Sequence, residues 1–275
     1  IRLLSVYPSS SLSANIATYF KFSSYNRVFS TACASGNYAI GNVFDLLRSG
    51  KADFGIAGGA DGPSSILFTG FNRLFAVASE KCQPFDKNRE GIIPGEGAGC
   101  LFLETLDSAV NRNAKIYAEI LGYGLSCDAS HMSNPSPKGI EKAIRKAIKL
   151  TKIKHKDVDY ISAHGTGTLE NDKAECEALH FVFGNKLKDI PVSSIKSMLG
   201  HTMGAAAALE TIACCLAIKY KQLPPTINVE DQDPECDIDC VPQYSRKCNA
   251  RVLLNSSQAF GGNNICLVLK EFYGR

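Results

Sequence analysis

The sequence predicts an α/β protein with a largely buried central sheet. Short apolar segments alternate along the chain with segments of helical periodicity, which is the pattern of such folds. Small residues flank the apolar segments, as expected where helices cover both faces of a sheet. With 275 residues and 45% hydrophobic side chains, the chain is long enough to bury a sizeable core.

In the first part of the chain, the sequence pattern predicts strands on either side of one helix. In order, we expect a strand at 26–30, a helix at 34–49, a strand at 52–58 and a strand at 99–106. The stretch before the last strand is rich in Gly, Pro and Phe, which indicates a loop.

A second part with the same alternation begins near Ala114. Its clearest element is amphipathic, because Ile140, Ile144 and Ile148 fall on one side of a helix. We expect strands at 115–123, 158–163, 190–195, 252–256 and 264–271, helices at 138–151, 171–183 and 204–220, and an ordered surface loop at 223–239. The alternation therefore predicts two segments of similar organisation.

Composition excludes several classes of function. The net charge of +3 and the lack of a long Lys/Arg run argue against nucleic-acid binding. The 11 Cys residues are odd in number and scattered, and no secretory signal is visible, which predicts reduced thiols in the cytoplasm. The most apolar run, 203–218, contains Glu210 and is too short for a membrane span, so it predicts a buried helix.

Cys33 lies in the string Thr-Ala-Cys-Ala-Ser-Gly at 31–36, after an apolar strand and at the start of a helix of small residues. The free amides of a first helical turn stabilise a thiolate and can hold an oxyanion. The string therefore fits a nucleophile, and it fits a buried structural cysteine equally well.

Two histidines follow apolar strands in the same way. His164 begins the string His-Gly-Thr-Gly-Thr, in which the hydroxyls of Thr166 and Thr168 can hydrogen-bond a substrate chain. His201 lies in a Gly-His turn before another helix of small residues. Lys196, five residues earlier, is either a surface charge or a cation that tunes the pKa of the site.

A fourth loop, Phe260-Gly261-Gly262, also follows a strand, and a Gly pair lets the backbone approach a ligand closely. The alternative is an ordinary tight turn between the last two strands. Because ligands gather at the carboxyl ends of strands in α/β sheets, we expect the four loops to share one pocket.

These strings, in this order, resemble the β-ketoacyl synthases of fatty acid and polyketide synthesis, of the elongating Cys-His-His type. The similarity runs from about Leu12 to the end of the chain. Further matching segments are Ala-Gly-Gly-Ala-Asp at 57–61, Pro-Phe-Asp at 84–86, Arg-Glu-Gly at 89–91, Gly-Glu-Gly-Ala-Gly at 95–99, Asp-Ala-Ser-His-Met at 128–132 and Pro-Pro-Thr-Ile-Asn at 224–228.

The resemblance implies a thiolase-like layered α-β-α-β-α fold with an incomplete N-terminal half. Only 32 residues precede Cys33, where the family has a long segment. Residues 1–107 would be the remnant of the N-terminal half with the nucleophile, and 108–275 the C-terminal half with both histidines. A homodimer or a ketosynthase heterodimer is implied.

The implied activity is decarboxylative Claisen condensation of an acyl thioester on Cys33 with a malonyl thioester. Acyl carrier protein is the implied partner, and the substrates carry phosphopantetheine, so no separate cofactor or metal is implied. The catalytic residues implied by matching positions are Cys33, His164, His201, Lys196, Glu175 and Phe260. The implied substrate-binding residues are Thr166, Thr168, Phe71, Ser133, Gly261 and Gly262.

Alternatives remain open at this point. The chain could be a non-catalytic partner subunit, although such chain-length factors usually lack the nucleophile, or an inactive fragment. A thiolase or a Cys-His-Asn synthase fits the two histidines less well. Zinc at Cys33, His164 and His201 is geometrically possible but ranks below catalysis, and the spacing of Cys236, Cys240 and Cys248 is unlike paired zinc ligands. Gln-Ala-Phe-Gly-Gly at 258–262 departs from the family's Phe-Gly-Phe-Gly-Gly, and the stretch 71–84 looks short.

Overall fold

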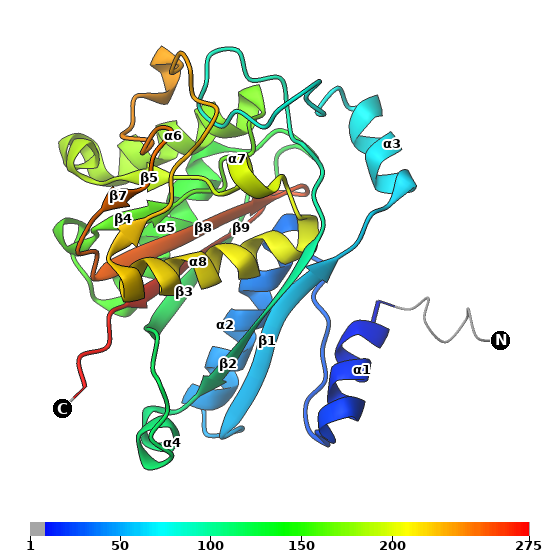
Figure 1. Cartoon of the computed structure of the whole chain (residues 1–275), viewed down its shortest axis with the longest axis vertical. Helices are drawn as coiled ribbons and strands as arrows, with labels where there is room; N and C mark the ends of the chain where they lie inside the picture. The colour runs from blue at the N-terminus through cyan, green and yellow to red at the C-terminus, as the bar shows by residue number, and fades with distance from the viewer. Residues whose placement is uncertain (1–8, 275) are drawn as a thin grey trace. The chain divides into compact units, whose positions relative to one another are not determined.

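The computed structural model describes residues 9–274 (Figure 1). The chain divides into two compact units, one up to Ser30 and one from Thr31 onwards. The described part of the first unit contains helix α1 (Ser11–Phe20). All elements described below belong to the second unit.

A five-stranded sheet forms the centre of the second unit (Figure 1). Its strands are, in spatial order, β3 (Glu119–Cys127), β9 (Asn263–Lys270), β8 (Val252–Ala259), β4 (Tyr160–Ser162) and β5 (Val192–Ser193). The short β4 runs parallel to β5 and β8, whereas β9 is antiparallel to both β8 and β3. The predicted α/β class with a buried sheet is confirmed.

Helices cover both faces of this sheet because β8 and β9 carry buried apolar side chains on both faces. Leu254 and Val268 pack with one cluster of helical residues, and their neighbours Leu253 and Leu267 pack with another. The first cluster includes residues of α5 (Pro137–Thr151) and α6 (Leu169–Phe183), and the second includes residues of α2 (Ser35–Arg48) and α8 (Ala206–Tyr220).

A second, smaller sheet lies beyond α2 and α8. It pairs β1 (Phe54–Asp61) with β2 (Gly97–Glu104) in antiparallel register, and α2 and α8 contact these two strands. Gly59 lets β1 approach the turn that leads into α8, since a Cβ there would lie 2.2 Å from the carbonyl oxygen of Gly204. The second unit is therefore layered α-β-α-β.

Shorter elements connect these layers. They are α3 (Ser65–Arg73), α4 (Leu106–Asn111), α7 (Lys196–Leu199), and the paired strands β6 (Gln222–Leu223) and β7 (Arg246–Lys247).

Several expected elements differ in the structure. Residues 26–30 form no strand, and the strand expected at 115–123 lies at Glu119–Cys127, where pairing with β9 sets its register. Helices α1 and α3 were not predicted because neither buries a full face that would give a periodic signal. The stretch 223–239 is not a simple surface loop, because Thr226 and Cys236 within it are fully buried.

The apolar run at 203–218 is a core helix, as predicted. By length and composition Met203–Tyr220 is the one described segment apolar enough to cross a membrane. Most of α8, however, packs between the two sheets, and Ala207, Cys214 and Ala217 on it are buried.

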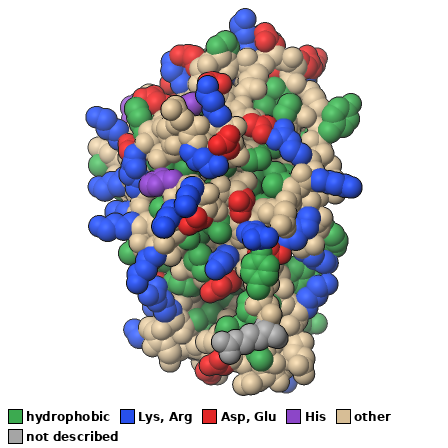
Figure 2. All heavy atoms as spheres, turned by 90° about the vertical axis from the view of Figure 1, so that its left-hand side faces the viewer, with side chains coloured by type: hydrophobic (Ala, Val, Ile, Leu, Met, Phe, Trp, Pro, Cys, Tyr) green, Lys and Arg blue, Asp and Glu red, His purple; other side chains and the backbone are tan. Residues whose placement is uncertain are grey.

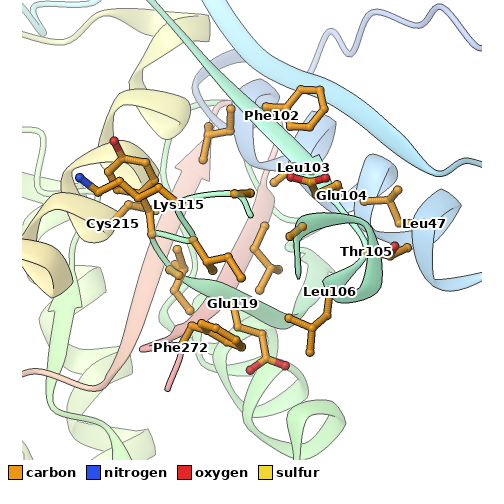
Figure 3. A pocket seen from close by; sticks show the side chains of 18 of the residues that line it. Leu47, Phe102, Leu103, Glu104, Thr105, Leu106, Lys115, Glu119, Cys215 and Phe272 are labelled. Atoms are coloured by element: carbon orange, nitrogen blue, oxygen red, sulfur yellow. The ribbon is translucent and has the colours of Figure 1, made fainter. Parts of the chain in front are cut away.

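Beside β2 lies a groove of about 670 Å³ with largely apolar walls (Figure 3). Leu103, Leu106 and Phe272 line it, together with Ile212 and Leu216 of α8. Among the described residues β2 pairs with β1 alone, so its other edge has no strand beside it. In the described part of the chain the smaller sheet thus has two strands and the larger one five.

Candidate active site

The four loops singled out in the sequence meet at one cavity of about 310 Å³. Cys33, His164, His201 and Phe260 all line it. The sulfur of Cys33 and one ring nitrogen each of His164 and His201 lie within 4.8 Å of one another, and all three side chains are buried. The two imidazole rings stand almost perpendicular, at 84°, with centroids 5.5 Å apart. The expected convergence of the loops is confirmed.

Cys33 lies in a 3₁₀ turn, Ala32–Ala34, that leads directly into α2. Ala32 before it has a φ of 47°, an uncommon conformation for a residue with a side chain. Gly36 permits the close packing of α2 on α8, since a Cβ there would lie 2.6 Å from the backbone N of Ala208. This turn fixes the thiol at the end of the helix facing the histidines.

Burial raises the pKa of the Cys33 thiol to about 11, although the Lys196 charge opposes this. The sequence led us to expect a stabilised thiolate. Because the loss of hydration outweighs the helix end and the nearby cation, the resting group is a protonated thiol.

Hydrogen bonds to its backbone, rather than to its ring, position His164 beside α6. Glu175 of α6 accepts hydrogen bonds from the backbone N–H groups of His164 and Gly165, each at 2.8 Å. Burial lowers the pKa of His164 well below its ordinary value, and the charge of Lys196 adds to the effect. The imidazole is therefore neutral.

His201 is neutral for the same reasons, because burial and then Lys196 lower its pKa well below the ordinary value. Its Nδ1 accepts the backbone N–H of Met203 at 3.1 Å. A neutral imidazole that accepts at Nδ1 carries its proton on Nε2. On the assigned hydrogen bonds, His201 therefore presents an N–H donor at Nε2.

Lys196 imposes the same tautomer on His164. Its ammonium lies 3.3 Å from Nδ1 of His164 and donates to the His164 carbonyl at 2.6 Å. With a cation as donor, Nδ1 is the acceptor and Nε2 carries the proton. Lys196 is buried, so the alternative of a surface charge is excluded.

Glu210 completes this arrangement and was missed in the sequence analysis as a site residue. It forms a buried ion pair with Lys196, and both side chains are almost fully inaccessible. Burial raises the pKa of Glu210, and the Lys196 charge opposes the rise. The available signal was its position as the lone charged residue in the apolar run at 203–218.

Asp172, also missed, holds the loop that follows His164. Its carboxylate accepts the backbone N–H groups of Phe85, Thr166 and Gly167 at 2.9 to 3.1 Å. Asp172 and Glu175 lie three residues apart on α6, which places both on the same side of that helix. Burial raises the pKa of Glu175 to about 7, against the opposing effect of its two backbone hydrogen bonds.

The expected substrate-binding residues lie mostly at this cavity. Thr166, Thr168, Phe71, Ser133 and Gly262 line it, and the two threonine hydroxyls are 2.9 Å apart. Gly261 is not a lining residue. Its N–H instead donates to the Met132 carbonyl at 2.7 Å.

Phe71 and Phe260 contact each other across the cavity, with ring centroids 5.6 Å apart. The loop that carries Phe260 is attached to the segment that begins at Asp128. The backbone N–H of Asp128 donates to the Gly262 carbonyl at 2.9 Å, and the side-chain amide of Asn264 donates to the Asp128 carboxylate at 2.6 Å.

The cluster of Cys33, His164 and His201 does not suit a metal ion, despite its spacing. A histidine that binds a metal through Nε2 donates its other N–H to an acceptor. Here Nδ1 of each ring faces a donor instead, from Met203 in one case and from Lys196 in the other. In the described part of the chain, Cys236, Cys240 and Cys248 form no such cluster.

The layered fold and the Cys-His-His cavity define a protein of the thiolase-like class. The chain belongs to the β-ketoacyl synthase family. Residues 4–109 match the family's N-terminal domain and residues 117–230 its C-terminal domain. The predicted division at 107/108 remains a prediction.

Individual relatives agree with this assignment. The chain is 43% identical over 251 residues to 3-oxoacyl-[acyl-carrier-protein] synthase 2 of Synechocystis sp., and 42% identical over 242 residues to nodulation protein E of a Rhizobium species. Each match covers 88% of this chain and 60% of the relative. The chain thus spans about three fifths of the curated relatives it matches.

Two solved structures are closely similar. The ishigamide ketosynthase/chain length factor gives a TM-score of 0.95 at 44% identity, over 97% of this chain and 66% of that one. A type II polyketide ketosynthase in complex with its acyl-carrier protein gives 0.94 at 34% identity, over 97% and 68%. The thiolase-like fold is thereby confirmed.

Proposed function

We propose that the chain carries the condensing site of a β-ketoacyl synthase, which joins an acyl group on Cys33 to a malonyl unit with loss of carbon dioxide. The observation that carries this proposal is the meeting of one thiol and two neutral imidazoles in one cavity. On the assigned hydrogen bonds, both imidazoles present Nε2–H donors.

In the first stage, the sulfur of Cys33 attacks the carbonyl carbon of an acyl thioester. The bond from that carbon to the carrier sulfur breaks, and the proton of the Cys33 thiol ends on the departing thiol. The backbone N–H groups of Cys33 and Phe260 are the proposed donors to the oxyanion.

In the second stage, a malonyl thioester occupies the cavity and loses carbon dioxide. The bond electrons left behind form an enolate, whose oxygen accepts hydrogen bonds from Nε2–H of His164 and His201. The enolate carbon then attacks the Cys33 thioester, which forms the new carbon–carbon bond and breaks the bond from the acyl carbon to sulfur. Cys33 leaves as a thiolate and takes a proton from water. No separate base is required, because carbon dioxide leaves without a proton transfer.

The other expected residues support these steps. Lys196 fixes the tautomer of His164, and Glu175 holds the backbone that carries that ring. Thr166 and Thr168 are proposed to contact the pantetheine arm, and contact between Phe71 and Phe260 would change with acyl occupancy. Ser133, Gly261 and Gly262 belong to the segments that form the entrance.

Acyl carrier protein is the proposed partner, and its phosphopantetheine arm is the proposed carrier of both substrates, with no further cofactor. One similar structure is described as a complex of a ketosynthase with its acyl-carrier protein, and another as a ketosynthase with its chain length factor. We propose similar assemblies for this chain, in a homodimeric or heterodimeric state. The proposed location is the cytoplasm.

One observation favours a second candidate, a condensing site that is inactive without further protein. The smaller sheet has two strands where the larger has five, and an apolar groove lies beside β2. The presence of Cys33 in the cavity argues against a non-catalytic chain-length factor.

Intact-mass measurement after incubation with an acyl carrier protein thioester separates the two candidates. A gain of one acyl mass on the parent, and none on Cys33→Ala, is expected for an active site. Absence of loading on a soluble, folded sample would contradict activity of the chain by itself. Adding malonyl carrier protein to the loaded sample then tests condensation.

A further inference from the structure

Two of the Lys and Arg side chains within residues 9–274 are buried, and the others lie wholly or partly at the surface. Figure 2 shows one face on which many of these surface cations lie. One buried cation is Lys196, beside the imidazole of His164. The other is Arg89, whose side chain is 1% exposed and which has no part in the condensation proposed above. A guanidinium is buried only where acceptors surround it, so the contacts of Arg89 indicate its role.

The guanidinium of Arg89 is bound to the loop that follows β4. Its Nη2 donates to the carbonyl oxygen of Leu169 at 3.1 Å, and its Nε donates to that of Thr168 at 3.3 Å. On its other side, Nη1 donates to the carbonyl oxygen of Asp86 at 2.8 Å and to the carboxylate of Asp233 at 2.5 Å. Arg89 therefore joins the end of this loop to two segments that are distant from it in the chain.

The start of the same loop is held by the ion-pair partner of Arg89. The carboxylate of Asp172 lies 3.7 Å from Nε of Arg89 and accepts the backbone N–H groups of Thr166 and Gly167 at 3.0 and 3.1 Å. The thiol of Cys82 donates to the Thr166 carbonyl oxygen at 3.4 Å. One buried ion pair thus binds the N–H groups at the start of the loop and the carbonyl groups at its end.

The conformation of this loop decides where two hydroxyl groups lie. Thr166 and Thr168 both line the Cys33 cavity, with their hydroxyl oxygens 2.9 Å apart. Gly167 between them has a φ of 78°, and a Cβ there would lie 2.9 Å from the carbonyl oxygen of Gly91. The loop therefore depends on tertiary contacts to keep the two hydroxyls at the cavity.

Arginine suits this position better than lysine. A guanidinium offers five N–H donors in a fixed planar fork, whereas an ammonium is a point charge with three donors. Burial raises the pKa of Asp172, and the N–H of Phe85 and the charge of Arg89 oppose the rise. Lysine would keep that charge but would not match the two loop carbonyls and the Asp86 carbonyl at once.

We infer that Arg89 is a positioning residue for substrate binding, which holds the loop so that the hydroxyls of Thr166 and Thr168 receive the pantetheine arm of the thioester. The inference rests on the proposed function, because that function brings such an arm into this cavity. In the described part of the chain, no hydrogen bond or ion pair of Arg89 reaches Cys33. Binding of the arm and reactivity of the thiol can therefore be measured separately.

The test compares alkylation of Cys33 by two probes, one with the arm and one without it. The probes are bromoacetamide and aminopantetheine bromoacetylated at its terminal nitrogen. With either probe, the Cys33 sulfur displaces bromide and forms a thioether, and the thiol proton passes to water. Rates are measured by peptide mapping on the parent, Arg89→Lys and Asp233→Asn. The last variant is the matched control, because it weakens the same ion-pair network and leaves both loop contacts of Arg89 in place.

We expect the arm to speed alkylation of the parent. Arg89→Lys should lower the rate with the pantetheine probe by about five- to tenfold, the effect of one or two lost hydrogen bonds, and the rate with bromoacetamide by less than about twofold. Asp233→Asn should change either rate by less than about twofold. Thr168→Val should also lower the rate with the pantetheine probe, and Arg89→Lys should add little in that background.

Four results would each overturn the inference: no advantage of the arm in the parent, no loss or equal losses with the two probes in Arg89→Lys, an equal loss in Asp233→Asn, or additive losses with Thr168→Val. Circular dichroism checks each fold. An unfolded Arg89→Lys beside a folded Asp233→Asn would assign Arg89 to general stability and would overturn it too. A parent that shows the arm's advantage but gains no acyl mass from an acyl carrier protein thioester would contradict the proposed activity and leave this inference standing.

Discussion

The carboxylate of Glu175 holds the backbone of His164 rather than its imidazole. Its two oxygens accept the N–H groups of His164 and Gly165, each at 2.8 Å, from the buried face of α6. The imidazole is held separately, at Nδ1, by Lys196. The position of the ring thus depends on Glu175 and its tautomer on Lys196.

Glu175→Gln should weaken the hydrogen bonds that hold the backbone of His164 and Gly165 after β4. A glutamine amide has one oxygen to accept a hydrogen bond, so one of the two backbone N–H groups would face its NH₂ group instead. A buried N–H left without an acceptor costs about 1–3 kcal/mol. We expect a lower rate of malonyl decarboxylation with little change in acyl loading of Cys33. Decarboxylation is measured as release of labelled carbon dioxide. An equal loss in both assays would indicate general unfolding instead.

The same substitution should change how stability depends on pH. Burial raises the pKa of Glu175 to about 7 from the ordinary 4.5, so the folded state binds this proton more tightly than the unfolded state. Its contribution is present at low pH and is lost as the pH rises from about 4.5 to 7, by about 3 kcal/mol. Urea unfolding should show this decline in the parent and not in Glu175→Gln. Parallel curves would contradict the raised pKa.

His201 variants test the proposed donor at Nε2. Glutamine can place an N–H near the position of Nε2, whereas alanine cannot. His201→Ala should reduce malonyl decarboxylation by about 10²- to 10³-fold, the usual effect of losing one oxyanion donor, and His201→Gln by clearly less. Loading of Cys33, followed by intact mass, serves as the control. Equal activity of the two variants would argue against hydrogen-bond donation at this position.

Much of this site could be predicted from the sequence because its residues lie in short local strings of small residues. His164 and Phe260 follow the strands β4 and β8, which places them at the sheet edge. Cys33 and His201 were visible from their strings before helices of small residues, although no strand forms at 26–30 and α7 precedes His201. Their convergence then followed from the topology, as the shared cavity confirms. Boundaries were less certain, since pairing with β9 and not local propensity fixes the position of β3.

Glu210, which pairs with Lys196 beside the histidines, could not be predicted in the same way. Glu210 faces Lys196 only because α8 crosses between the two sheets, and the chain separation of 14 residues gives no local pattern for the pair. The protonated state of Cys33 was also missed, because burial is a tertiary property that outweighs the helix end.

The buried pair of Lys196 and Glu210 predicts strong coupling between these two residues. Lys196→Met alone leaves the Glu210 carboxylate buried without a partner and should cost about 3–5 kcal/mol of the free energy of unfolding. Combined with Glu210→Leu, it should cost less than the sum of the two single changes. Urea unfolding of all four chains gives the coupling energy as a double-mutant cycle. Additive losses would show that the pair contributes no mutual stabilisation.

The raised pKa of Cys33 predicts slow alkylation at neutral pH. With a pKa of about 11, the thiolate fraction rises about tenfold for each pH unit between 7 and 10, and the iodoacetamide rate should rise with it and show no plateau. Lys196 lowers the pKa of Cys33, so Lys196→Met should slow the reaction further at each pH. Peptide mapping by mass spectrometry distinguishes Cys33 from the exposed Cys100 and Cys127, which serve as internal references. A plateau below pH 8 would show instead that the helix end and Lys196 outweigh burial and hold a thiolate at rest.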